Sequence, residues 1–193
     1  MIKRHKEFGG IKMADMMNKV VVFLAVDGFE AGAFKSLWEC FGNLNASTRI
    51  AGFNADDEIK DDAGLVNTHS DMSFDQAGLL TPDVVVIADG ITAGAVKDDP
   101  AAQSLLQEAF NRRAAIVSVD GGAAMLASMG FINGLTITAP AFLKDEIENA
   151  GATLSKEPIS VSKNVFSAMG NADLQALCDM VSEYITGKME QAA

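Results

Sequence analysis

Apolar and polar residues follow one another along the chain in blocks that predict strands and helices in turn. Residues 19–26 (KVVVFLAV) and 82–88 (PDVVVIA) are short apolar runs rich in β-branched residues, as is typical of strands covered on both faces. Residues 30–44 instead place apolar side chains at helical spacing, which predicts a helix with one buried face. Further strands are expected at 48–53, 115–119 and 135–138, and further helices at 99–113, 122–129, 144–149 and from a cap at Asn171 to Gly187.

Two stretches depart from this block pattern. Residues 54–79 are polar and irregular, with weak alternation over 64–72 that indicates a small hairpin or strand excursion. Residues 159–168 alternate around Lys163 and Asn164, which predicts a second hairpin or two short strands. The alternation of strands and helices, with no linker or repeat, predicts one α/β domain over residues 18–193, with a mainly parallel sheet and helices on both faces.

The first 17 residues are excluded from the predicted domain. They form a basic segment that we expect to be a mobile tail or an over-long start. This segment lacks the apolar stretch of a secretory signal, and no run in the chain approaches the length that spans a bilayer. The sequence therefore predicts a cytoplasmic protein without a membrane partner.

Composition and charge limit the function classes. The chain has 193 residues, of which 49% are apolar, enough to build a core and to exclude disorder. Its 15 Lys and Arg against 26 Asp and Glu give a formal charge of −11, which makes nucleic acid an improbable partner because affinity for phosphates depends on basic residues. Most of this acidity is expected to serve solubility.

Cysteine and histidine are scarce, and this restricts the available chemistry. Cys40 and Cys178 are too few for a disulfide framework or a Cys-rich zinc site, and each falls in an apolar helical pattern, so we expect two small buried hydrophobic side chains. The two histidines, His5 and His69, exclude a multi-His metal site. His69 lies among polar residues and is expected at the surface.

Three buried strands are predicted to end in the same way, with an aspartate followed by glycine. Asp27, Asp89 and Asp120 occupy these positions. Ligands of doubly wound sheets bind beyond the carboxyl ends of the strands, so the three carboxylates could converge on one site together with Glu30. The alternative is ordinary turn chemistry, because Asp bonds its own backbone and Gly supplies positive φ.

Asp120 stands out because Gly121 and Gly122 lead directly from a strand into a helix. Small residues at this point are the steric requirement of a nucleophile elbow, here with a carboxylate as the elbow residue. Ser118, two residues earlier, is expected to be a buried hydroxyl bonded to the backbone.

At this point the sequence resembles the ThiJ/PfpI superfamily, the Parkinson disease protein 7 family, within the class I glutamine amidotransferase-like fold. The resemblance covers roughly residues 19–187 and implies a flavodoxin-like three-layer sandwich and a homodimer, with Phe34 and Trp38 of the first helix as a plausible contact region. The segments that carry it are 21–30 (VVFLAVDGFE), 82–90 (PDVVVIADG), 114–126 (AAIVSVDGGAAML) and 137–152 (ITAPAFLKDEIENAGA).

The departures from the family pattern remove its usual thiol chemistry. Asp120 stands where the family's elbow normally carries cysteine, and Ala139 stands where many members have histidine before proline. Of two acidic positions in the first strand-to-helix turn, Glu30 matches one and Ala33 replaces the other. Asp89 and Gly90 replace the paired glycines that offer N–H groups to an oxyanion. A Cys-dependent peptidase or deglycase is therefore not expected.

Three functions stay open. In the first, the domain is a stress, regulatory or small-ligand-binding protein without a cofactor, its ligand unknown. In the second, it is a hydrolase or lyase for a small carbonyl or ester-like substrate, with Asp120 as nucleophile or base and Glu30 as acid/base partner. In the third, strand-end carboxylates bind a divalent cation. The tentative catalytic residues are Asp120 and Glu30, and the candidate ligand-binding residues are Asp27, Asp89, Gly90, Gly121, Gly122 and Ala139.

Overall fold

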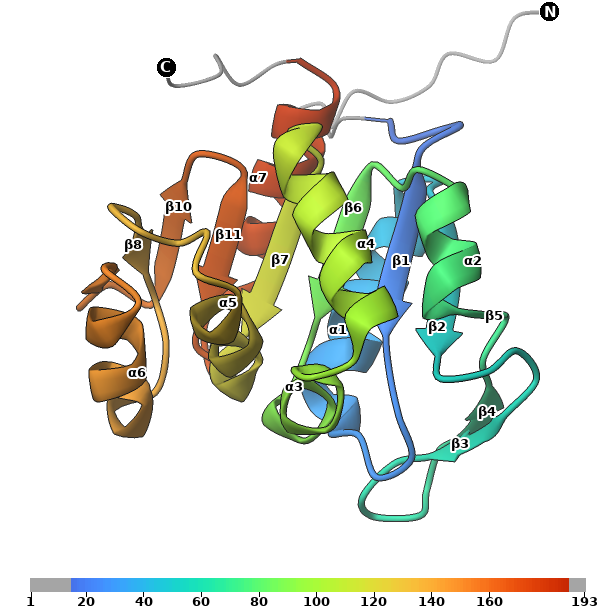
Figure 1. The fold of residues 1–193 in the computed structure, drawn as a ribbon. Coiled ribbons are helices and arrows are strands. Elements are labelled where there is room, and N and C mark those ends of the chain that lie inside the picture. Colours follow the sequence, from blue (N-terminus) through green and yellow to red (C-terminus); the bar gives the residue numbers. More distant parts are fainter. Residues whose placement is uncertain (1–14, 188–193) are drawn as a thin grey trace, which may run out of the picture.

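A computed structural model describes residues 15–187 of the chain (Figure 1). Within these residues, seven strands form one sheet in the order β10-β11-β7-β6-β1-β2-β5, with all neighbours parallel except β10 and β11. The strands are β1 (Val20–Leu24), β2 (Ser47–Gly52), β5 (Met72–Ser73), β6 (Val84–Ile87), β7 (Ala115–Val119), β10 (Ile159–Ser162) and β11 (Val165–Ala168).

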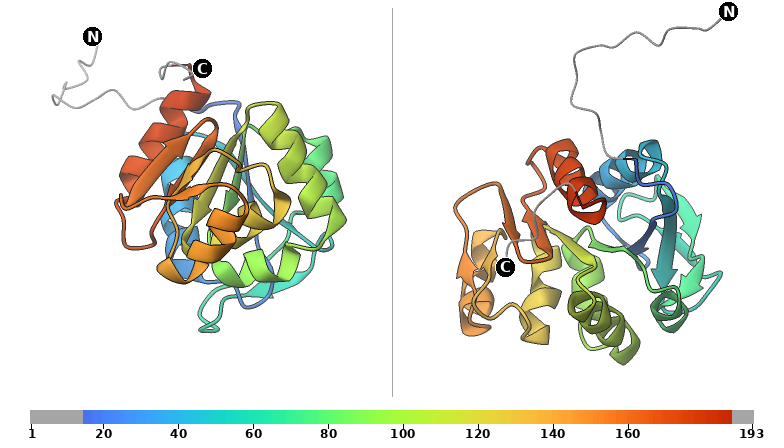
Figure 2. Two further views of the ribbon diagram at one scale, coloured as in Figure 1. Left: turned by 60° about the vertical axis from the view of Figure 1, so that its left-hand side comes forward. Right: turned by 90° about the horizontal axis from the view of Figure 1, so that it is seen from above.

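Helices cover both faces of this sheet, as Figure 2 shows from above. The helices α1 (Ala31–Asn43) and α7 (Leu174–Ile185) pack on one face. The other face is covered by α2 (Phe74–Leu79), α3 (Gly90–Val96), α4 (Pro100–Asn111), α5 (Ala123–Met129) and α6 (Lys144–Asn149). The predicted three-layer α/β sandwich with a mainly parallel sheet is confirmed.

The central strands explain why the sequence shows continuous apolar runs. In β1, Val21 and Phe23 face the α1/α7 layer, whereas Val22 and Leu24 face the opposite layer, and all four are fully buried. Because each face of the strand meets a helix layer, neither set of alternating positions tolerates polar side chains.

The irregular stretch 54–79 contains more structure than the sequence indicates. It holds an antiparallel hairpin of β3 (Glu58–Lys60) and β4 (Asn67–His69), then β5 and α2. Helix α2 begins with a capping box, in which Ser73 accepts the Gln76 N–H and the Gln76 side chain accepts the Ser73 N–H. His69 is exposed on β4, as expected.

The C-terminal half follows the predictions with small shifts. The hairpin β10–β11 turns at Lys163 and Asn164, and a second, two-stranded sheet pairs β8 (Thr136–Ile137) with β9 (Thr153–Leu154). The last helix is capped by Asp173, whose carboxylate accepts the Ala176 N–H at 3.0 Å, so the prediction of a cap at Asn171 is wrong by two residues. A short 3-10 helix, η2 (Ala141–Leu143), leads into α6.

The two cysteines form a disulfide between α1 and α7. Their burial is confirmed, with Cys40 5% and Cys178 0% exposed, but their sulfur atoms are bonded to each other. The expectation of two separate hydrophobic side chains is corrected on this point.

The described chain starts and ends at one edge of the sheet. Residues 1–14 of the predicted tail lie outside the described residues, whereas Met16 is fully buried and donates its N–H to the Leu44 carbonyl. Figure 1 places both described ends above the amino ends of β1, β6 and β7, opposite the loops that follow these strands. No helix within residues 15–187 is long and apolar enough to cross a membrane.

Candidate functional site

The loops after β1, β6 and β7 carry the three strand-end aspartates. These strands lie side by side and parallel in the sheet, so Asp27, Asp89 and Asp120 emerge at the same edge. The topology therefore brings the three loops together, although each carboxylate has a different local role.

Asp120 forms the elbow between β7 and a 3-10 turn, η1 (Asp120–Gly122), that leads into α5. Its backbone is left-handed, with a φ of 47°, which is uncommon for a residue other than glycine. Its half-buried carboxylate accepts the Gly170 N–H at 2.7 Å. A Cβ at Gly170 would overlap the same carboxylate, so any side chain at this position would displace the Asp120 carboxylate from its hydrogen bond.

Gly90, Gly121 and Gly122 allow the elbow to pack against the turn after β6. A Cβ on Gly121 would lie 2.6 Å from the Cα of Gly90, and one on Gly122 would lie 2.5 Å from the Ile87 carbonyl oxygen. These distances exclude any side chain. The close backbone approach gives the glycines a packing role in addition to the ligand-binding role that the sequence predicts.

Asp89 is the N-cap of α3 and is only 1% exposed. Its two carboxylate oxygens accept the Thr92 N–H at 2.7 Å and the Thr92 hydroxyl at 2.9 Å. Burial raises the pKa of Asp89, and hydrogen bonds from Thr92 and from the backbone of Glu30 and Ile91 oppose that rise. Asp89 thus joins the loop after β6 to the start of α1.

Glu30 precedes α1, and its side chain is exposed and makes no capping bond. Its pKa is raised by partial burial first and then by repulsion from Asp89, Asp62 and Asp120. Glu30 and Asp120 are therefore close enough to interact electrostatically. Among the described residues, no hydrogen bond joins their carboxyl groups.

Asp27 organises the loop after β1. Its carboxylate accepts the Lys60 N–H at 3.0 Å, and the next residue, Gly28, donates its N–H to the Lys60 carbonyl at 2.7 Å with a φ of 88°. Both bonds tie the loop to β3, which is the turn role that the sequence offered as an alternative. Asp27 also borders a cavity of about 320 Å³ between the ends of β1 and β2, the hairpin and α3, whose lining includes Val26, Phe53, Asp57, Glu58 and Ile59.

Two further positions restrict the chemistry near the elbow. Ala139 is buried before Pro140 and offers no titratable group where many related proteins have histidine. Ser118 is fully buried as expected, but its hydroxyl has no hydrogen-bond partner among the described residues, so the expected bond to the backbone is not formed.

The structure adds residues that the sequence did not indicate. Gly170 holds the Asp120 carboxylate from 50 positions away, and Thr92 satisfies both oxygens of Asp89. For Gly170, the only signal in the sequence is a glycine shortly after a predicted strand. Within residues 15–187, no three His, Cys, Asp or Glu side chains are arranged so that they could share a metal ion.

Comparisons with known proteins agree on one family and one fold. The family model described as "DJ-1/PfpI family" matches residues 18–184. Drosophila melanogaster DJ-1beta superposes with a TM-score of 0.79 at 19% identity, covering 88% of this chain and 91% of that one. A ThiJ/PfpI domain protein from Brachyspira murdochii gives 0.79 at 16% identity, covering 90% and 99%.

A third structure is larger than this chain. A two-domain protein from Anabaena variabilis, with DJ-1/ThiJ/PfpI-like and ferritin-like domains, gives a TM-score of 0.80 at 21% identity. The match covers 84% of this chain and 47% of that protein, so this chain spans about half of its length. No curated protein matches the sequence. At these identities the structural likeness shows the fold alone.

Proposed function

Because the chain belongs to the DJ-1/PfpI family but carries a carboxylate at the elbow, we propose that it is a small-ligand-binding or regulatory protein of the cytoplasm and not a thiol enzyme. The proposal depends on one observation, the fixed position of Asp120: its carboxylate accepts a hydrogen bond from the Gly170 N–H, a contact that we call the seat of Asp120. A side chain fixed in this way is suited to positioning a bound ligand.

The chemistry around the elbow supports binding over thiol catalysis. A cysteine nucleophile needs a thiolate stabilised by a base or cation, whereas this elbow has Asp120 and a buried Ala139. Both cysteines of the chain are joined to each other between α1 and α7. The proposed pocket contains Asp120, Glu30, Asp89 and Asp27, and the neighbouring cavity of about 320 Å³ is large enough for a small metabolite.

The alternative function is carboxylate-dependent hydrolysis or lysis, with Asp120 as nucleophile or base. One observation favours it: the pKa of Glu30 is raised by partial burial and by the neighbouring carboxylates, a direction that favours the protonated form a proton donor needs. The weakness of this alternative is the second step, because a covalent ester on Asp120 needs an activated water, and Ala139 supplies no base for it.

A thermal-shift screen with small metabolites and divalent cations tests the proposal. Ligands that bind the pocket should raise the melting temperature of the wild-type protein and of Asp145→Asn, an exposed control on α6, but not of Asp120→Asn. Turnover of a stabilising compound by the wild type, lost in Asp120→Asn, would establish the enzyme instead. A shift that is retained in Asp120→Asn would place the ligand elsewhere, and a shift by Mg²⁺ or Ca²⁺ would revive cation binding.

The proposal includes a homodimer formed at a groove beside α1. A groove of about 370 Å³ lies between α1, β2 and the β3–β4 hairpin, lined largely by Phe29, Phe34, Trp38, Ile50 and Val66. Phe34 and Trp38 stack with ring centroids 5.7 Å apart. An apolar, aromatic groove of this kind supports association with a second copy of the chain.

A further inference from the structure

The cysteine pair joins the two helices that cover one face of the sheet. Cys40 lies near the end of α1 and Cys178 in the first half of α7, 138 positions apart, and they are the only cysteines of the chain. Their Cα atoms are 6.6 Å apart, within the range that a disulfide requires. Figure 2 shows α1 and α7 side by side on this face.

The same two helices are connected to the two carboxylates at the centre of the candidate site. Glu30 is the N-cap residue of α1, and Gly170, which donates its N–H to Asp120, lies four residues before α7. The disulfide therefore completes a covalent connection from Glu30 along α1, through the two sulfur atoms, and back along α7 to Gly170, whose N–H binds the Asp120 carboxylate.

We propose that Cys40–Cys178 is a redox-sensitive clasp: in the disulfide form it holds α7 against α1 and fixes the seat of Asp120, and in the dithiol form α7 and residues 169–173 loosen. A redox role for this bond rests on the cytoplasmic location proposed above: in a reducing cytoplasm, disulfides are rare, and those that form are usually transient or redox-sensing. A bond between the only two cysteines of the chain is therefore a candidate for control by the thiol pool.

The exchange reaction is balanced by a thiol co-reactant. A thiolate of a cellular dithiol attacks one sulfur of the bond, forms a mixed disulfide and releases the other cysteine as a thiolate, which takes up a proton. The second thiol of the reductant then displaces the remaining cysteine. Two electrons and two protons pass to Cys40 and Cys178, and the dithiol leaves as a disulfide.

Burial of the sulfur atoms makes reduction of the Cys40–Cys178 bond slow. Cys178 is fully buried and Cys40 nearly so, in an apolar cluster that includes Leu37, Leu177 and Val181. A reductant reaches the sulfur atoms only when α7 opens from the domain, and a helix at the end of the described chain opens at lower free energy than the central strands. The clasp therefore responds to sustained changes in thiol redox state.

Hydrogen exchange on oxidised and reduced wild-type protein tests the clasp without any substitution. Mass spectrometry after alkylation under denaturing conditions should count no adducts in the oxidised protein and two after treatment with dithiothreitol. Reduction should speed amide exchange at least tenfold in α7 and in residues 169–173, with β1, β6 and β7 unchanged. A Cys40→Ala/Cys178→Ala variant should exchange like the reduced protein in both conditions.

Three results would overturn the proposal. The first is two free thiols in folded protein equilibrated with glutathione disulfide. The second is equal exchange of α7 and residues 169–173 in the two redox states. The third is a bond that survives millimolar dithiothreitol on the folded chain for days, which would make it a permanent cross-link. These readouts need no ligand, so they are independent of the proposed pocket.

Discussion

At the scale of single residues, the contact between Asp120 and Gly170 decides the geometry of the elbow. Asp120 could be singled out from the sequence because its strand, glycines and helix are contiguous. Gly170 could not, since the hydrogen bond spans 50 positions and nothing local to residues 168–172 requires a carboxylate partner. The pairing of Cys40 with Cys178 escaped prediction for the same reason, because burial and spacing along separate helices do not reveal which helices are neighbours.

Replacing Gly170 with alanine should destabilise the fold by about 1–3 kcal/mol, because the new Cβ overlaps the Asp120 carboxylate. Urea unfolding measures the change. Gly94→Ala, in α3 with open space around its Cβ, is the matched control and should be neutral or stabilising by up to about 1 kcal/mol. Asp120→Gly should rescue much of the Gly170→Ala loss, and strict additivity of the two changes would argue against the contact.

Glu30 should make stability depend on pH in a predictable direction. Its pKa in the folded protein lies above its ordinary value of 4.5, because of burial and then repulsion from Asp89, Asp62 and Asp120. The folded state thus holds the Glu30 proton more tightly than the unfolded state. Protonated Glu30 therefore contributes to the free energy of unfolding below pH 4.5, and this contribution is lost as pH rises through the raised pKa.

Glu30→Gln should therefore stabilise the protein at pH 7, by up to about 0.5 kcal/mol given the exposure of the side chain, and have little effect at pH 4. Chemical unfolding at both values measures the difference. Glu146→Gln, exposed on α6 and away from both the site and the groove beside α1, is the control. A destabilising effect of Glu30→Gln at neutral pH would contradict the repulsion described for the site.

At the scale of elements, the central strands, the longer helices and the short helices α5 and α6 could be predicted, whereas α2 and α3 could not. Central strands buried on both faces leave short apolar runs rich in β-branched residues. Asp99 with Pro100 marks the start of α4 as expected. By contrast, α2 and α3 have six and seven residues, and α2 lies at the end of the polar stretch 54–79, so neither shows a clear helical period. Their starts depend on the caps Ser73 and Asp89, and the position of Asp89 at the end of a strand indicates a site residue as readily as a helix cap.

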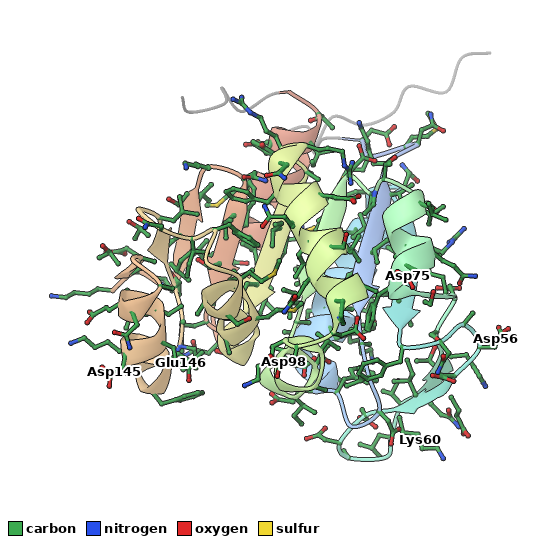
Figure 3. All side chains as sticks on the ribbon, viewed as in Figure 1. Asp56, Lys60, Asp75, Asp98, Asp145 and Glu146 are labelled. Carbon is green, nitrogen blue, oxygen red and sulfur yellow. A yellow bond between two sulfur atoms is a disulfide. The ribbon has the colours of Figure 1, made fainter. Side chains whose placement is uncertain are left out.

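At the scale of the whole molecule, the acidic surplus divides into a large surface part and a small part at the site. Figure 3 shows Asp56, Asp75, Asp98, Asp145 and Glu146 projecting from the domain, and all five are exposed. Such charges fit the solubility role expected from composition. Only a few carboxylates shape the elbow, and one of them, Asp89, is buried in the domain. Net charge alone could therefore not have located the site.

Association of two copies also belongs to this scale. Thr68→Arg places a long charged side chain in the groove beside α1 and should weaken a homodimer at least tenfold. Thr136→Arg, at the exposed position of β8, is the matched control and should leave association unchanged. Sedimentation equilibrium over a range of protein concentrations measures both. A dimer equally strong in the two variants would move the interface away from this groove.

The position of the two described chain ends has a practical consequence. The described chain begins just before β1 and ends just after α7, at the edge of the sheet opposite the loops that follow β1, β6 and β7 (Figure 1). The described domain is therefore entered and left by the chain on the side away from Asp120, which favours attaching an affinity tag, a fluorescent reporter or a surface tether through the terminal segments. The domain can be immobilised by either terminus with the loops after β1, β6 and β7 turned toward solution, the orientation that a sensor chip or a display library needs for discovering what this protein binds.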